Sequence, residues 1–161
     1  GSGKILGGVP IQFVYMLVVI VISGLILNRT KFGRNIYAVG DNKQAASYSG
    51  INSRRVTMTV FVIMGIFASC AGILSSARTF SAQFNVGEGS EMDAISAVVL
   101  GGTSMSGGVG RLSGTIIGCI VIGVLNNGMN ILGIDSSWQY VVKGVVVLIA
   151  VFIDYIKKMK D

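Results

Sequence analysis

Few side chains in this sequence could carry out covalent chemistry. The chain contains no histidine, which excludes a Ser–His–Asp triad and a Cys–His pair. Cys70 and Cys119 each lie inside an apolar run, where cysteine usually serves as a small packing residue. The chain also lacks a GxxxxGK(S/T) phosphate-binding loop. We therefore predict that it is not an enzyme, that it holds no metal or cofactor, and that any nucleotide it depends on binds to another subunit.

Charged side chains in the second half of the chain form one candidate polar site. Glu88, Glu91 and Asp93 are spaced like paired carboxylates, but acids also favour the first turn of a helix. We interpret them as an external loop that ends at a helix start. Lys143 could meet Glu88 or Glu91 in an outer gate, but a lysine near a helix end more commonly extends to the membrane surface. We favour that second interpretation.

Three asparagines form another candidate site. Asn126, Asn127 and Asn130 lie inside an apolar run, and Asn126 and Asn130 share one helical face at i, i+4 spacing. Polar side chains at that depth in a membrane need partners. Hydrogen bonds between helices and contacts with a polar solute both fit, and the first is slightly favoured.

The elements that carry these residues are membrane helices. The chain of 161 residues is 52% hydrophobic and only 12% charged, with a mean hydropathy of +0.72, whereas soluble domains carry about 25% charged residues. Four runs are each about 25–33 Å long as helices, enough for a hydrocarbon layer of ~30 Å. They cover residues 11–27, 56–77, 112–132 and 140–156. We predict an all-α, polytopic transmembrane helical bundle.

The placement of charge indicates the number of crossings. A fifth apolar stretch, residues 94–100, is short and breaks at Gly101 and Gly102. If residues 94–110 cross, ten of the 13 Lys and Arg residues lie in the cytoplasm. We therefore predict about five crossings, the third broken by glycines, with the C-terminus cytoplasmic. Because the positive residues flank apolar runs, the net charge of +6 is read as a topology signal and not as a nucleic-acid site.

Glycines recur every four residues at Gly110, Gly114 and Gly118. Such a stripe lets two helices approach closely. The stripe could form a dimer face or a pore lining, but packing within the subunit is the favoured interpretation.

The cationic connection over residues 28–55 is too long for a minimal loop. Asp41 or Asn42 can cap a short helix over residues 43–49, and Gly50 can end it. A short helix between two membrane helices could dock a soluble partner or rest on lipid headgroups. The residues alone favour neither alternative.

Four stretches resemble the ribose-type monosaccharide permeases of ABC transporters, in the same order along the chain. They are residues 33–52, 91–104, 107–111 and 125–133. The similarity extends from about residue 30 to the end. It implies a single transmembrane permease unit over residues 1–161 that supplies the second half of a longer subunit. It also implies a multi-pass protein of the bacterial inner membrane.

This resemblance implies partners and site residues. The family subunit pairs with a second copy in the lipid bilayer, receives solute from an extracytoplasmic sugar-binding protein, and docks ABC ATPase subunits that bind ATP. The residues expected to couple to the ATPase are Gly40, Asp41, Asn42, Ala45, Ala46, Ser49 and Gly50. The residues expected along the transport path are Gly101, Gly102, Thr103, Asn126, Asn127 and Asn130.

The resemblance leaves the solute open. Residues 91–133 are most similar to ribose permeases, whereas Trp138, Gln139 and Tyr140 are similar to the galactoside branch. A sister permease for a nucleoside or a signalling furanose is one alternative. A structural membrane subunit that does not transport is another.

Overall fold

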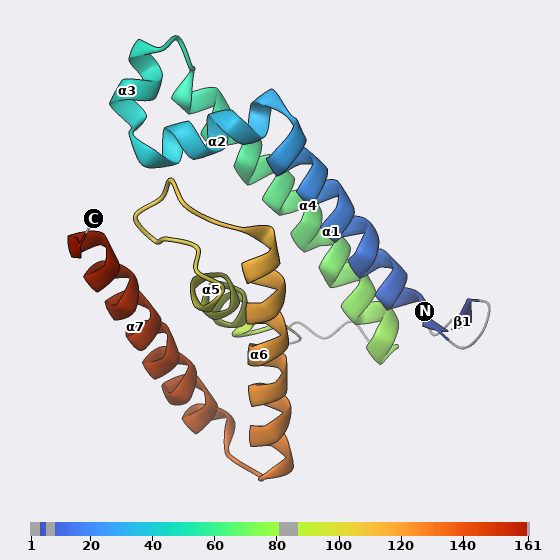
Figure 1. Cartoon of the computed structure of the whole chain (residues 1–161). Helices are drawn as coiled ribbons and strands as arrows, with labels where there is room; N and C mark the ends of the chain where they lie inside the picture. The colour runs from blue at the N-terminus through green and yellow to red at the C-terminus, as the bar shows by residue number, and fades with distance from the viewer. Residues whose placement is uncertain (1–3, 6–8, 81–86, 161) are drawn as a thin grey trace. The chain divides into compact units, whose positions relative to one another are not determined.

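The computed structural model describes residues 4–5, 9–80 and 87–160, and these residues are almost entirely helical. Two short strands, β1 (Lys4–Ile5) and β2 (Val9–Pro10), pair antiparallel at the start. The helices are α1 (Ile11–Arg29), α2 (Lys31–Asp41), α3 (Lys43–Tyr48), α4 (Ser53–Thr79), α5 (Ser90–Leu100), α6 (Leu112–Ile131) and α7 (Ser136–Lys160) (Figure 1). The predicted all-α class is confirmed.

Each of the four long apolar runs forms a helix. Among the described residues, α1, α4 and α6 are long and apolar enough to cross a membrane, and α7 contributes a shorter apolar segment, Ser136–Phe152. The fifth stretch forms α5, which ends at Leu100, immediately before the predicted break at Gly101. Its 11 residues give a length of about 16 Å, so α5 alone is too short to span the hydrocarbon layer. The architecture is that of a helical membrane bundle.

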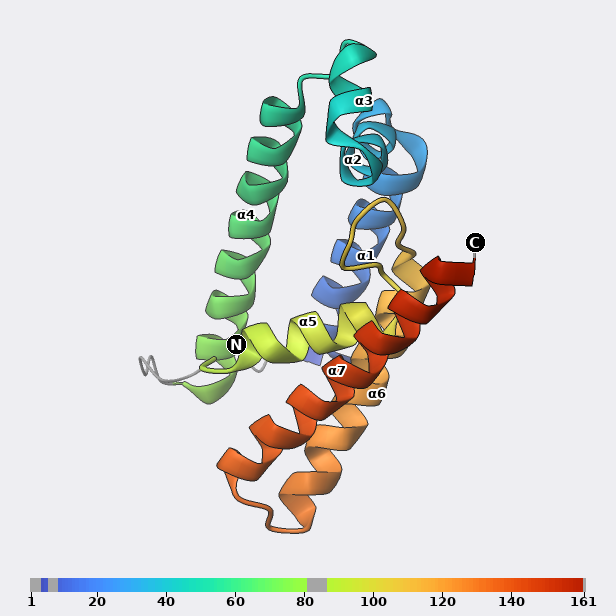
Figure 2. The same ribbon diagram turned by 90° about the vertical axis from the view of Figure 1, so that its left-hand side faces the viewer.

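The helices gather into two compact units, Gly1–Glu88 and Gly89–Asp161. In the first unit, α2 and α3 join α1 to α4, and Figure 2 shows α1 and α4 separated along their lengths. The apolar side chains of α1 and α4 are therefore left largely exposed, as expected for surfaces that face lipid or other helices. A tight corner at Gly33 joins α1 to α2, because a Cβ there would overlap the carbonyl oxygens of Ile26 and Leu27.

In the second unit, α5 is wedged between α6 and α7. These two longer helices diverge from the turn that joins them, and α5 contacts both (Figure 1). The glycine stripe explains the close approach of α5 to α6: a Cβ at Gly114 would overlap the Gly101 carbonyl, and one at Gly118 would overlap the Ala97 carbonyl. Packing within the chain, the favoured interpretation of this stripe, is confirmed for Gly114 and Gly118.

The connection over residues 28–55 holds two helices, where only one was predicted. Helix α3 matches the expected helix over residues 43–49, but α2 was not predicted. Thr30 caps α2 by accepting a hydrogen bond from the Gly33 amide at 3.1 Å. Phe32, Ile36 and Val39 then recur at helical spacing and are all partly buried. The glycines and charges in this segment obscured that apolar face.

Candidate functional site

The coupling segment, defined as residues 30–55, is held in shape by its own polar side chains. Asn42 separates α2 from α3, and its Oδ1 accepts hydrogen bonds from the amides of Gln44 (3.0 Å) and Ala45 (2.9 Å). Asn42 is therefore the cap of α3, whereas Asp41 is the last residue of α2. Gly50 has φ +82, a left-handed conformation that a side chain would strain, and it directly follows the C-cap, Ser49.

The predicted coupling residues lie together on this segment, and all but one are exposed. The exposed members are Gly40, Asp41, Asn42, Ala45, Ser49 and Gly50. Ala46 is buried, and its carbonyl accepts a hydrogen bond from the Ile51 amide at 3.0 Å. The small side chain at position 46 thus serves packing inside the unit, while the other six can meet a partner.

The segment also presents an aromatic side chain that the sequence patterns did not single out. Tyr48, the last residue of α3, is 90% exposed. Exposed Lys43, Arg54 and Arg55 flank it in the sequence. Exposed aromatic side chains are enriched at interface hot spots. One signal in the sequence could have identified it, because Tyr48 is the only aromatic residue between residues 38 and 60.

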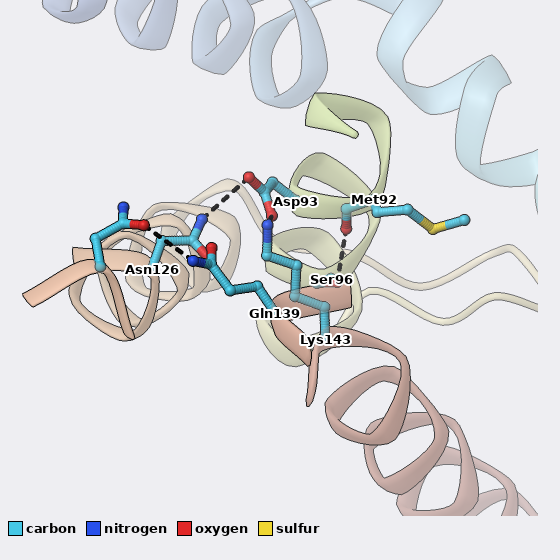
Figure 3. A network of polar contacts seen from close by, with 7 residues as sticks. Met92, Asp93, Ser96, Asn126, Gln139 and Lys143 are labelled. Atoms are coloured by element: carbon cyan, nitrogen blue, oxygen red, sulfur yellow. Dashed lines mark hydrogen bonds and ion pairs between the residues drawn. The ribbon is translucent and has the colours of Figure 1, made fainter. Parts of the chain in front are cut away.

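A polar network joins the three helices of the second unit (Figure 3). Asp93 of α5 forms an ion pair with Lys143 of α7, with 2.6 Å between Oδ1 and Nζ. The second carboxylate oxygen of Asp93 accepts a hydrogen bond from Asn126 Nδ2 of α6 at 3.0 Å. The Lys143 ammonium also lies 5.6 Å from the centre of the Tyr140 ring. One carboxylate therefore bridges both neighbouring helices.

Lys143 does not extend to the membrane surface as we had expected. The residue is only 8% exposed, and its partner is Asp93 and not Glu88 or Glu91. Helix α7 begins at Ser136, so Lys143 lies two turns inside it, facing α5. The apolar run used to place the helix start hid this first turn. Glu91 and Asp93 do lie in the first turn of α5, as predicted.

A second branch of the network lies near the turn between α6 and α7. Gln139 Nε2 donates to Asn130 Oδ1 and to the carbonyl of Ile134, both at 2.9 Å. Within the turn, Asp135 Oδ1 accepts a hydrogen bond from the Ser137 amide at 2.8 Å. Hydrogen bonds from Ser137 hold the pKa of Asp135 below its ordinary value. These contacts close the open end of the two diverging helices.

The predicted transport-path residues divide into two groups. Asn126 and Asn130 take part in hydrogen bonds between helices, the arrangement we had favoured, whereas Asn127 is exposed. The Oδ1 of Asn126 is buried and accepts no hydrogen bond from any described residue. Gly101 contacts the backbone of Gly114, and Gly102 is exposed with φ +83. Thr103 is partly buried beside Gly110, at the start of the loop that leads to α6.

Asp93, Lys143 and Gln139 were missed as members of this network. Each is an isolated polar residue in or beside an apolar segment, which is the signal that marks functional positions in membrane proteins. The sequence could not supply their pairing, because 50 residues separate Asp93 from Lys143 (143 − 93). Pairing at that separation depends on how the three helices pack.

Comparisons with known proteins agree with this architecture. The family model described as branched-chain amino acid transport system / permease component matches residues 3–151. The ribose import permease protein of Bacillus subtilis is 49% identical over 154 residues, covering 96% of this chain and 48% of that protein. Its counterpart in Escherichia coli (strain K12) is 48% identical, with the same coverage of each chain. The xylose transport system permease protein of Haemophilus influenzae is 44% identical, covering 95% of this chain and 41% of that protein.

The similarity therefore extends over nearly the whole chain, and it confirms the resemblance to ribose-type permeases. The chain spans about half the length of the curated relatives it matches. No solved structure matches it. With three membrane-length helices and a family match over residues 3–151, this chain is a multi-pass membrane protein and belongs to the permease-component family of branched-chain amino acid transport systems.

Proposed function

We propose that this chain is half of the membrane-spanning permease subunit of an ATP-driven monosaccharide importer, with ribose as the first candidate solute. The observation that carries the proposal is identity of 48–49% to two ribose import permeases over 96% of the chain. The permease itself would catalyse no reaction. It would form a path that alternates between outward- and inward-facing states, with residues 1–161 acting as one unit of the longer protein.

The coupling segment is the proposed contact for an ABC ATPase subunit. The argument rests on its shape and exposure: a capped short helix, α3, follows α2 and displays six exposed residues. They are Gly40, Asp41, Asn42, Ala45, Ser49 and Gly50. Ala46 would support the contact from beneath. The cationic character of the segment favours a cytoplasmic location, and the same rule favours a cytoplasmic C-terminus.

The transport path is proposed to follow the second unit, along Gly101, Gly102, Thr103 and the asparagines of α6. Asn126 supports this proposal most directly, because its buried Oδ1 lacks a donor among the described residues and could accept one from a sugar hydroxyl. Asn127 is exposed, and Asn130 shares the face of Asn126. The proposed partners are an extracytoplasmic sugar-binding protein and a second permease copy.

Xylose is a second candidate solute, because a xylose permease is 44% identical over nearly the same part of the chain. Ribose and xylose are both pentoses, and the polar side chains of the second unit offer amide, carboxylate and ammonium groups to hydroxyls of either sugar. Galactose also stays in the comparison because of the Trp138–Gln139–Tyr140 stretch.

The test is uptake of labelled ribose, xylose and galactose by cells that lack the chromosomal permease gene, with and without the full-length gene restored. We expect the deletion to abolish uptake of one sugar and the restored gene to recover it. A strain that keeps the permease but lacks the ATPase gene is the matched control, and it should fail to import that sugar. Unchanged uptake of all three sugars would contradict the proposal and favour another polar solute or a subunit that does not transport.

A further inference from the structure

The Asp93 carboxylate is the point where the three helices of the second unit meet. Its Oδ1 binds the Lys143 ammonium of α7, and its Oδ2 accepts from Asn126 of α6 (Figure 3). The Lys143 and Asp93 side chains are 10% and 32% exposed, so the ammonium is almost fully enclosed. An enclosed charge without a counter-charge is strongly unfavourable, and each member of the pair therefore depends on the other.

Helix α5 is fixed at both of its ends. Its N-terminal end lies against α7, since a Cβ at Gly89 would come within 2.6 Å of the Tyr140 hydroxyl. Its C-terminal end lies against α6 through Gly101 and Gly114. Steric contacts alone would allow α5 to slide between the two diverging helices. The two bonds to Asp93 fix its position along both of them.

The position of α5 determines the position of the loop that follows it. The amide of Thr103 donates to the carbonyl of Val98 at 3.2 Å, so the loop is tied back to the helix. The amide of Ser104 donates to the carbonyl of Val109 at 3.0 Å, which closes the loop on itself before α6. A shift of α5 would therefore move residues 101–111 with it.

We propose that Asp93 and Lys143 are positioning residues for transport, whose ion pair, shared with Asn126, sets the place of α5 and of the loop over residues 101–111. This inference rests on the proposed transport function. Neither residue is required to touch the solute. The requirement is for one positive and one negative charge at this junction, and the reversed pair should meet it. The Oδ1 of Asn126, which accepts nothing from the described residues, can then receive a hydrogen bond from the ammonium that D93K introduces.

The test uses the full-length permease together with its ATPase and binding protein in cells. The variants are D93N, K143M, the reversed pair D93K/K143D and the conservative D93E. The matched control is E91Q, which removes the same charge from the same helical turn at an exposed position. Uptake of labelled ribose is measured per permease molecule in the membrane. Hydrogen exchange of residues 101–111 in the purified permease gives a second readout that does not require transport.

We expect D93N and K143M each to lower the maximal uptake rate on the order of tenfold or more, because each strands a charge. The half-saturating sugar concentration should stay unchanged, since the pair acts on α5 and not on the solute. The reversed pair and D93E should recover most of the rate, and E91Q should match the wild type. D93N should also accelerate exchange in residues 101–111.

The inference is overturned if D93N transports as well as E91Q, or if the reversed pair is no better than the single variants. If the wild type itself imports none of the sugars, the proposed function fails, and the exchange measurement still decides the positioning role. Unchanged exchange in D93N would then overturn the inference independently of any transport result.

Discussion

Individual residues in this protein act mainly by permitting or fixing contacts between helices. Gly114 and Gly118 permit α6 to touch the backbone of α5, while Asp93 fixes the same helix with its charge. Small and charged residues thus act on one interface from opposite ends. Both kinds of contact can be tested by single substitutions.

Substitution of Gly114 should loosen the contact between α5 and α6. The Cβ of G114A would overlap the Gly101 carbonyl, and forced overpacking of this kind costs about 1–3 kcal/mol. We expect a lower thermal midpoint for the purified full-length permease in detergent. The control is G123A on the same helix, where no atom lies within 4 Å of the added Cβ. Equal midpoints for the two variants would show that the backbone contact can be relaxed without cost.

Substitution of Asn42 should fray α3. N42A removes the acceptor of two amide hydrogen bonds, and loss of such a cap costs about 1 kcal/mol. We expect faster hydrogen exchange in residues 43–48, whereas N42D, which keeps a capping oxygen, should exchange like the wild type. If N42A exchanged no faster than N42D, then packing and not the cap would maintain this helix.

At the scale of elements, the sequence was a good guide to the long helices and a poor guide to their pairing. Hydrophobic runs identified α1, α4, α6 and α7 because membrane helices announce themselves by length and composition. Helix α2 was missed because its apolar face is interleaved with glycines and cations. The ion pair of Asp93 with Lys143 was missed for another reason: its formation depends on the packing of three helices, which no local pattern encodes.

The coupling segment should depend on Tyr48 as an anchor. Y48A removes a ring that is 90% exposed, and buried aromatic anchors at interfaces commonly contribute at least about 2 kcal/mol. We expect reduced sugar uptake and reduced stimulation of the ATPase, at an unchanged amount of permease in the membrane. Y48F keeps the ring and should behave like the wild type. Full activity in Y48A would exclude the anchor and favour a contact of Tyr48 with lipid headgroups.

At the scale of the whole molecule, the charges predict the orientation in the membrane. Reporter fusions after residues 50, 111 and 161 should report the cytoplasm, and a fusion after residue 80 should report the outside. Paired fusions of a fluorescent protein that matures only inside and a phosphatase active only outside would measure this. A fusion after residue 111 that reports the outside would contradict the broken third crossing and leave α5 on one side.

The position of α5 also has a consequence for biogenesis. Asp93 leaves the ribosome 50 residues before Lys143 (143 − 93), and an unpaired aspartate near the middle of a membrane helix costs about 2.5–3.5 kcal/mol on insertion scales. The short helix therefore cannot reach its final place when it is synthesised. It must wait near the translocon or the membrane surface until α7 brings the counter-charge. The last helix to be made would then be the one that completes insertion of an earlier one.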